Sequence, residues 1–570
     1  MMNLNGRTLR RRTPDNEAVN SLIATGISPP LARIYAARGI TSANDLDTGI
    51  LGLAHYSKLL HAEKAASLLA DAIRDGKKLL CIGDFDVDGA TATTVCVQGL
   101  RAMGANIAYL VPDRFRFGYG LSAEIVRVAA ERNPDILITV DNGMSSIEGV
   151  TEANRLGMQV IITDHHLPIK GITPEAACIV NPNQEGCPFP SKNLPGVGVI
   201  WYVLAALRAE LRKRGILEQD SNEPNLYQLL DLVALGVIAD VVKLDRNNRI
   251  LVEAGLKLIR AGKTRPGIKA LFQVAKTRIQ TACSSDLGFN IGPRLNAAGR
   301  LDDMSQGIEC LLSDNLDRAL PLAQTLNDLN NERKSIESDM KDSALEILEV
   351  VKADQRNALI LHDPSWHQGV IGILASRLKE QYHRPAIAFA DAGDGLLKGS
   401  GRSVTGLHLR DALDWVNKTH PGLIQKFGGH AAACGLTLKT QNLAPFTEAF
   451  ETAVTTLLGD ETSLDPVIET DGELTPHEMT LELADELALG IWGQGFPEPL
   501  FDGKFKVLQQ SIVGEKHLKL RLELDGAQIA GIYFFNTELL PDEATLVYAV
   551  CINEFNGLRS LQLIIRDRHT

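Results

Sequence analysis

Three apolar segments of the chain are each followed directly by side chains that bind metal ions. Asp84, Asp86 and Asp88 follow residues 79–83, Asp141 follows residues 136–140, and Asp164, His165 and His166 follow residues 160–163. Short apolar runs are typical of buried parallel strands, whose carboxyl ends lie at one edge of a sheet. Carboxylates gathered there repel one another unless cations lie between them. The pattern therefore predicts a site for divalent metal ions.

The ligand types indicate which metal and which reaction. Mixed imidazole and carboxylate ligands suit Mn²⁺ better than Mg²⁺, and the lack of thiolates disfavours Zn²⁺. Two such ions can activate a water molecule and stabilise the leaving oxygen of a displacement at phosphorus. The residues alone thus predict metal-dependent hydrolysis of a phosphoester or a phosphoanhydride.

Glycine-rich segments elsewhere, which we interpret as turns and loops, carry candidate phosphate-binding side chains. Glycines let backbone amides approach an anion, and arginine can bind a phosphate with two hydrogen bonds. The candidates are Arg114, Arg294, Asn296, Arg300, Ser400, Arg402 and His430, with Tyr119 as a side chain that can stack on a base. Any one of them could be an ordinary surface residue, but several such segments together favour phosphate binding.

Residues 77–182 alternate between apolar runs and amphipathic segments, which predicts a mainly parallel α/β sheet with helices on both faces. We expect strands at 78–83, 106–111, 135–141 and 159–163, and helices at 89–103, 122–132 and 145–157. Residues 196–262 are predicted to be mostly helical. A helix over 226–242 would bring Asp240 to the same edge of the sheet.

The rest of the chain indicates three further parts. Apolar residues recur at helical spacing from about residue 320 to 351, which predicts one long helix connecting two domains or, alternatively, a dimer coil. A second α/β unit follows, with strands near 358–361 and 386–390 and a helix over 370–382. Alternating runs from about residue 464 onward predict a small β-barrel.

Composition limits the possible function classes. A chain of 570 residues is expected to form about two to four domains, and a net charge of −12 argues against binding nucleic acid by bulk positive charge. The longest apolar stretch is too short to span a membrane, and no apolar signal region follows the basic N-terminus. Eight cysteines without a CxxC pair fit reduced thiols, so we expect a cytoplasmic protein without a membrane partner.

Long motifs extend over essentially the whole chain. They read GDFDVDGAT, RFxxGYGL, VDNGxSS, TDHHLP, NPN, LVALGxxADVV, GPRLNAAGRLDDM, WHQGVxGILASR, GSGRS, FGGHAAACG, WGQGFPEPLFDG and INEFNGLRSLQ. Together they resemble the DHH phosphoesterase superfamily, and within it the bacterial single-strand-specific 5′→3′ DNA exonucleases. The resemblance implies an N-terminal helical extension (1–70), a DHH catalytic domain (71–312), a connector helix (313–353), a DHH-associated α/β domain (354–460) and a C-terminal OB-fold barrel that binds single strands (461–570).

The resemblance also implies residue roles and partners. The catalytic residues that coordinate two Mn²⁺ or Mg²⁺ ions would be Asp86, Asp88, Asp141, His165, His166 and Asp240, with Asp141 bridging, Asp84 close by, and Asp164 orienting a ligand histidine. The phosphate-binding candidates would line the path of the DNA. Expected partners are single-stranded DNA, single-strand-binding protein and a RecQ-type helicase, and the chain is expected to be a monomer. The chain departs from the family at Val87 and at Arg116 and Phe117, without losing a ligand.

Two alternatives remain open beside a processive exonuclease that releases 5′-mononucleotides in DNA repair and recombination. The same chemistry could act on short oligonucleotides or small phosphoanhydrides, as in shorter members of the superfamily. A non-catalytic replication or repair scaffold is the other alternative, but it is disfavoured because every proposed metal ligand is present.

Overall fold

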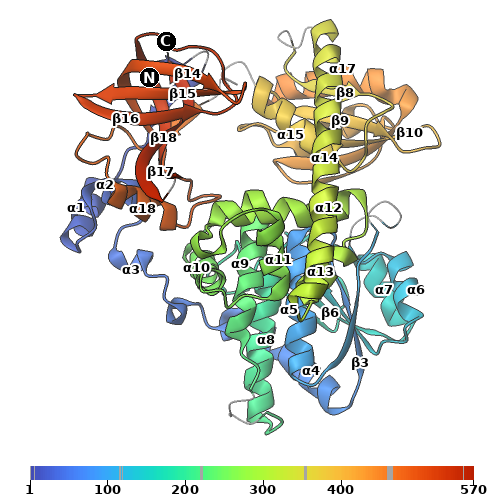
Figure 1. The fold of residues 1–570 in the computed structure, drawn as a ribbon. Coiled ribbons are helices and arrows are strands. Elements are labelled where there is room, and N and C mark those ends of the chain that lie inside the picture. Colours follow the sequence, from blue (N-terminus) through green and yellow to red (C-terminus); the bar gives the residue numbers. More distant parts are fainter. Residues whose placement is uncertain are drawn as a thin grey trace. The chain divides into compact units, whose positions relative to one another are not determined.

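The computed structural model describes residues 2–4, 7–113, 117, 120–217, 223–351, 356–458, 467–555 and 557–569. The chain forms two compact units, whose elements are shown in Figure 1. The larger unit comprises Arg11–Asp328 and Glu469–Thr570, and the smaller unit comprises Met1–Arg10 and Leu329–Ile468. Helix α14 (Leu316–Val351) passes along the chain from one unit to the other, as predicted for the connector.

The larger unit contains a parallel sheet in which the strand order is β4-β3-β5-β6-β7. Its strands are β3 (Lys78–Ile82), β4 (Asn106–Leu110), β5 (Ile136–Val140), β6 (Gln159–Thr163) and β7 (Cys178–Val180). The first four strands match the predictions, whereas the short strand β7 was missed. The order reverses between β3 and β5, and α/β sheets bind their ligands at the carboxyl ends of strands beside such a switch point.

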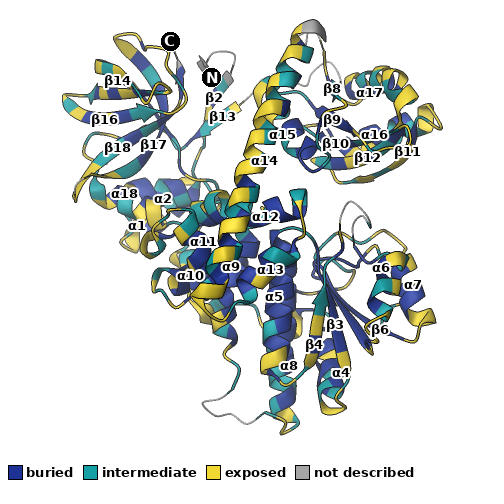
Figure 2. Ribbon diagram, turned by 45° about the vertical axis from the view of Figure 1, so that its right-hand side comes forward, coloured by how far each residue is buried: buried dark blue, intermediate teal, exposed yellow. Residues whose placement is uncertain are grey.

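Helices cover both faces of this sheet. Helices α6 (Ala123–Ala130) and α7 (Ile147–Arg155) pack against one face through a shared apolar core. Helices α5 (Val87–Ala102) and α8 (Gly196–Lys213) contact each other and the sheet, and α5 is buried on nearly every face (Figure 2). The small residues of α5 permit this close packing, because a Cβ at Gly99 would lie 2.3 Å from Leu204.

Further helices complete this part of the larger unit. They are α4 (Ala62–Arg74), α9 (Leu230–Ala239), α10 (Arg246–Arg260), α11 (Pro266–Val274), α12 (Gly292–Leu301) and α13 (Ser305–Leu312). The helix predicted over 226–242 is a short 3-10 turn followed by α9, which ends with Asp240 as its C-cap. The prediction for 292–300 was wrong in type, because this glycine-rich segment is helix α12 and not a turn.

Residues near the C-terminus form a closed barrel in the order β14-β15-β16-β18-β17. Its strands are β14 (Phe501–Val513), β15 (His517–Leu524), β16 (Ala527–Tyr533), β17 (Glu543–Phe555) and β18 (Leu558–His569). Alternate side chains of β15 point into the core, which includes Phe501, Phe505 and Tyr548. The predicted barrel is therefore confirmed.

The N-terminal segment is not wholly helical as expected, because two strands precede its helices. Strands β1 (Met2–Leu4) and β2 (Arg7–Arg11) pair in a sheet with β13 (Val467–Thr470). Helices α1 (Asn16–Ala24), α2 (Pro29–Ala36) and α3 (Ala43–Leu46) follow. These strands were not predicted because β2 is mostly arginine, and Leu9 is the one buried residue among its residues 8–11.

The smaller unit has a mixed sheet in the order β11-β12-β10-β9-β8. Its elements are β8 (Leu359–His362), α15 (Ile371–Tyr382), β9 (Ala386–Asp391), β10 (Leu396–Arg402), α16 (Leu409–Thr419), β11 (Ile424–Gly429), β12 (Ala433–Lys439) and α17 (Leu443–Leu458). The turns predicted at Gly399–Gly401 and Gly428–Gly429 are instead parts of strands β10 and β11. The fold class as a whole matches the prediction.

Two other expectations concerned membrane-spanning segments and the state of the cysteines. The helices of the described residues include none that is both long and apolar enough to span a bilayer. All eight cysteines are free thiols, and six of them are buried.

Candidate metal centre

The candidate ligands converge at the carboxyl edge of the parallel sheet. Asp84, Asp86 and Asp88 follow β3, and Asp141 follows β5, the two strands at the switch point. His165 and His166 follow β6, and Asp240 ends α9. Helix α9 is apolar apart from Asp231 and is buried from Leu230 to Val237, so its position fixes where Asp240 lies.

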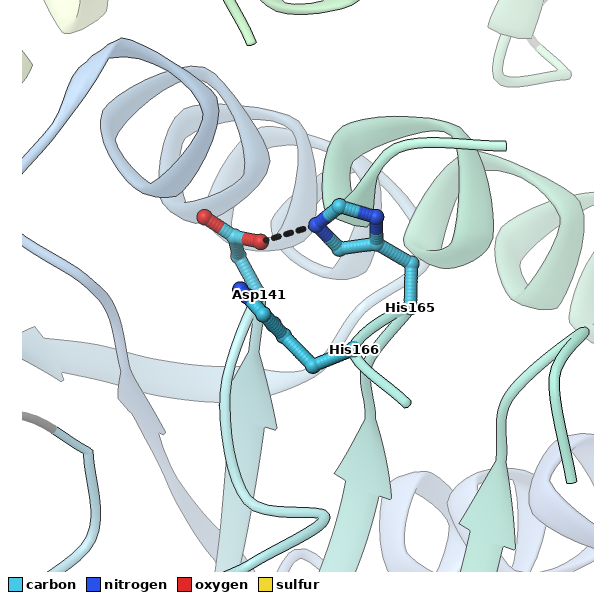
Figure 3. A group of neighbouring side chains, drawn as sticks. All are labelled: Asp141, His165 and His166. Carbon is cyan, nitrogen blue, oxygen red and sulfur yellow. Dashed lines mark ion pairs between the residues drawn. The ribbon is translucent and has the colours of Figure 1, made fainter. Parts of the chain in front are cut away.

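His165 lies at the centre of these contacts. Its Nε2 atom is 3.1 Å from Asp141 Oδ1, 3.6 Å from Asp240 Oδ2 and 3.9 Å from Asp88 Oδ2. Figure 3 shows the His165 ring directed at the Asp141 carboxylate. One imidazole nitrogen is therefore close to carboxylates from three separate elements.

Three overlapping groups of ligand atoms, each within 4.8 Å, can hold metal ions. They are Asp141 with His165 and His166, Asp88 with His165 and Asp240, and Asp84 with Asp86 and Asp141. Asp141 and His165 each belong to two groups, which is the arrangement expected where ions share a ligand. The Asp240 Oδ2 atom is buried, and no described residue donates a hydrogen bond to it. The residues present thus fit divalent cations.

Backbone amides at the start of α8 fix the position of Asp88. The Gly196 amide donates to its Oδ2 at 2.6 Å, and the Val197 amide donates to its Oδ1 at 2.9 Å. The positive end of the α8 dipole stabilises this buried carboxylate. Glycine is needed at 196, because a Cβ there would lie 2.5 Å from the Cβ of Asp141.

Asp164 orients the two histidines. Its Oδ1 accepts hydrogen bonds from the His165 amide (2.7 Å), the His166 amide (3.1 Å) and His166 Nδ1 (2.8 Å). Its Oδ2 accepts one from the Met144 amide at 2.8 Å. Because Nδ1 of His166 bonds Asp164, this histidine would bind a metal through Nε2.

The ionisation of the site reflects crowded, buried carboxylates. Burial, reinforced by repulsion from Asp86, raises the pKa of Asp88 to about 7. Burial and neighbouring carboxylates also raise the pKa values of Asp141 and Asp240 well above the usual range. A bound cation relieves this repulsion.

In the Asp164–His166 pair, the mutual hydrogen bond stabilises the charged forms of both side chains. Burial alone would raise the pKa of Asp164, but the hydrogen bond from His166 outweighs it and lowers the pKa to about 2. Burial alone would lower the pKa of His166, but the bond to Asp164 outweighs it and raises the pKa to about 9. Asp164 therefore stays ionised and holds the imidazole in place.

Three candidate phosphate-binding residues lie on α12, next to the loop that carries Asp84 and Asp86. A Cβ at Gly299 would lie 1.8 Å from the backbone oxygen of Phe85, so α12 packs directly on this loop. Arg294, Asn296 and Arg300 are partly buried on this helix. Arg294 donates to Asn290 O and to Asn327 Oδ1 (3.1 Å), and burial lowers its pKa.

Other candidates lie in the smaller unit. Ser400 and Arg402 are two residues apart on β10 and share one face, and Arg402 Nη1 donates to Ser400 Oγ at 3.1 Å. Both side chains lie at the start of α15, within 3.0 Å of where a Gly372 Cβ would be. His430 lies between β11 and β12, and β12 pairs with β10. Arg114 and Tyr119 lie outside the described residues.

Two asparagines that support the histidine loop were not among the predicted site residues. Asn181 Nδ2 donates to His166 O at 2.8 Å, and Asn183 Nδ2 donates to His165 O at 2.6 Å. They form the NPN motif after β7, so the motif itself was the signal. Its role depends on the pairing of β7 with β6, and β7 was not among the predicted strands.

Family models match three parts of the chain. The DHH family N-terminal domain matches residues 78–237, the DHHA1 domain matches 355–456, and the RecJ OB domain matches 470–567. The single-stranded-DNA-specific exonuclease RecJ of Salmonella typhimurium is 50% identical over 98% of this chain and 99% of its own length. This chain belongs to the RecJ family.

Solved structures of the RecJ family agree with the sequence match. RecJ from Thermus thermophilus in complex with Mn²⁺ has a TM-score of 0.83 and 29% identity, covering 99% of this chain and 79% of the other. Its complex with Mg²⁺ has a TM-score of 0.77, covering 99% and 78%. The RecJ of Escherichia coli is 50% identical over 98% of both chains. The candidate ligands from Asp84 to His166 all lie within the DHH match, and Asp240 lies just beyond its end.

Proposed function

We propose that this chain is a metal-dependent exonuclease that degrades single-stranded DNA from the 5′ end and releases 5′-mononucleotides during DNA repair and recombination. The observation that carries the proposal is the set of three overlapping ligand groups at the switch point of the sheet, in a chain that matches RecJ exonucleases over nearly its full length. Relatives with bound Mn²⁺ and Mg²⁺ support both metals as cofactors.

The proposed ligands of two ions are Asp84, Asp86, Asp88, Asp141, His165, His166 and Asp240, and those from Asp86 onward are the catalytic set. Such ions supply a water molecule of lowered pKa and stabilise charge on the leaving oxygen. Asp164 keeps the His166 ring oriented, and the α8 amides keep Asp88 in place. Asn181 and Asn183 hold the backbone of the histidine loop.

The remaining roles concern the substrate. We assign phosphate and nucleotide contacts to Arg114, Tyr119, Arg294, Asn296, Arg300, Ser400, Arg402 and His430. On the barrel, a hollow is lined by Gln509, Ser511, Lys519, Leu520, Arg521, Gln528, Ile529 and Ala530. Its two cations are suited to the phosphates of a single strand.

The proposal extends to organisation and context. The domain limits remain those given above, at residues 70, 312, 353 and 460. We propose a monomer that works in the cytoplasm with single-strand-binding protein and a RecQ-type helicase. A pull-down of the purified chain with each of these two proteins tests the partners.

The test of the activity uses single-stranded DNA with a 5′-phosphate and a 3′ label, incubated with Mn²⁺. We expect the wild-type chain to shorten it progressively from the 5′ end. Asp141→Ala is expected to reduce the rate by about 10³-fold or more, because it removes a shared ligand. Asp135→Ala is the matched control. Asp135 comes directly before β5, whereas Asp141 comes directly after it, and among the contacts described the Asp135 carboxylate accepts a hydrogen bond only from the Lys78 amide.

The outcomes separate the exonuclease from the alternatives. If neither the wild type nor the Asp135→Ala variant degrades the strand, the exonuclease assignment is wrong. Hydrolysis of dinucleotides without attack on longer DNA would identify a phosphodiesterase for short substrates. Mn²⁺ binding with no hydrolysis of any phosphodiester would indicate a scaffold.

A further inference from the structure

A tight turn next to the barrel lies against the segment that follows Asp240. It lies between α18 (Leu481–Leu489) and β14, and we call Gly493–Phe496 the 493–496 turn. The Gly493 and Phe496 backbones exchange two hydrogen bonds, of 2.9 and 3.0 Å. Gly495 has a φ of +70°, a conformation that favours glycine at the third position of a turn.

The 493–496 turn contacts the backbone and side chains of residues 243 and 244. The Leu244 amide donates to the Gln494 oxygen at 2.8 Å. A Cβ at Gly493 would lie 2.8 Å from Leu244 Cδ1, and one at Gly495 would lie 2.5 Å from Lys243 Cγ. The absence of both side chains therefore allows this close approach.

The turn is held firmly by contacts that do not involve Asp240. Ser284 Oγ donates to the Trp492 oxygen at 2.9 Å. The Trp492 ring stacks on Phe496 and Tyr35, at centroid distances of 5.5 and 5.9 Å. The Arg249 guanidinium lies 4.5 Å from the centre of the Phe496 ring and donates to Leu244 O at 3.0 Å. The turn can therefore impose a position on the segment it contacts.

That segment contains a strained residue immediately after the metal-ligand candidate. Val241 has a φ of +60°, which is rare and costly for a β-branched residue. Its side chain is 62% exposed, so burial of the side chain does little to offset the cost. Helix α9 fixes the chain before Val241. After it, the chain is held by the 493–496 turn and by Asn248 Nδ2, which donates to Lys243 O at 3.0 Å.

We propose that the 493–496 turn positions Asp240 for metal binding by holding Val241 in its left-handed conformation. The inference rests on the proposed function, in which Asp240 is a ligand. Without the turn, Val241 would relax toward a right-handed or extended conformation, and the Asp240 carboxylate would leave the site. The fraction of binding-competent protein then falls on the order of tenfold, and the apparent Mn²⁺ affinity falls with it.

The experiment measures Mn²⁺ binding to the full chain by calorimetry, without DNA. Gly495→Ala introduces a Cβ against Lys243 at a φ of +70°. Its matched control is Gly262→Ala, which has a φ of +67° and no atom within 4 Å of the new Cβ. We expect Mn²⁺ affinity to fall about tenfold in Gly495→Ala and to stay unchanged in Gly262→Ala. Adding Val241→Gly should recover most of the loss, because glycine adopts this φ without strain.

Two further variants keep the result interpretable. Ser284→Ala, which removes one anchor of the turn, should weaken Mn²⁺ binding in the same direction if Gly495→Ala fails to fold. Asp240→Asn tests the proposed function itself, which fails if this variant binds Mn²⁺ like the wild type. If Asp240→Asn weakens binding but Gly495→Ala and Ser284→Ala match Gly262→Ala, or if Val241→Gly recovers nothing, the positioning role is wrong.

Discussion

Replacing Asp164 by Asn tests whether the metal centre depends on a residue that need not touch the metal. Asp164 is 1% exposed, and its carboxylate accepts four hydrogen bonds, three at Oδ1 and one at Oδ2. Asparagine has one oxygen, which can replace Oδ1. Its NH₂ group then faces the Met144 amide, so that two donors oppose each other in a buried position.

The expected magnitude follows from these contacts. A buried donor left without a partner costs about 1–3 kcal/mol. The bond to His166 also loses its charged acceptor, which costs about 1 kcal/mol more. We therefore expect the free energy of unfolding to fall by about 2–4 kcal/mol. Because the neutral acceptor holds the His166 ring less firmly, Mn²⁺ binding should weaken by about 10- to 100-fold.

The assays are urea denaturation in EDTA and calorimetric titration with Mn²⁺. Asp502→Asn is the matched control, because Asp502 is also 1% exposed and accepts bonds from Arg11 and Thr470 within the same unit. Both variants should lose stability, but only Asp164→Asn should lose Mn²⁺ affinity. Equal Mn²⁺ affinity in the two variants would refute the role of Asp164 in orienting His166.

Three other predictions concern charge. Asp141→Asn should raise the unfolding temperature in EDTA by about 2–4 °C, because it removes one buried carboxylate from a cluster of carboxylates that repel one another. Scanning calorimetry measures this change. The double variant Lys519→Ala, Arg521→Ala should bind single strands with a weaker salt dependence. The slope of log binding constant against log salt concentration should become smaller by about 1.4 in magnitude, because two phosphate contacts are lost. Filter binding at several salt concentrations measures this slope, and an unchanged slope would contradict the prediction. Arg38→Ala should lower the free energy of unfolding, measured by urea denaturation, by about 3–5 kcal/mol, because it leaves the buried Asp471 carboxylate without this partner. If that is the cause, the double variant Arg38→Ala, Asp471→Ala should lose less stability than Arg38→Ala alone.

The sequence predicted the parts of the site that depend on local pattern. Strand ends are recognisable because an apolar run stops where polar residues begin, as at Asp84 and Asp141. The prediction that Asp240 ends a helix at the same edge was also correct in its essentials, since α9 is apolar apart from Asp231. These features require no knowledge of distant contacts.

The glycine-rich segments were misinterpreted because glycine has more than one use. In α12, Gly299 is present because the Phe85 backbone occupies the place of a side chain. In β10, Gly399 is present because a Cβ would lie 2.4 Å from the Phe389 ring. Turn chemistry and close packing select the same residue, and only the tertiary contacts distinguish them.

Backbone strain at the candidate metal centre leads us to expect that its metal affinity depends on remote parts of the chain. Asp141 and Val241 both have left-handed backbones, with φ values of +62° and +60°. Aspartate accepts this conformation at modest cost, whereas valine does not. The cost at Val241, like the repulsion among the carboxylates, must be offset by the stability of the surrounding fold. Metal binding relieves the repulsion, so substitutions that weaken the fold around the site should weaken metal binding as well, even where they touch no ligand.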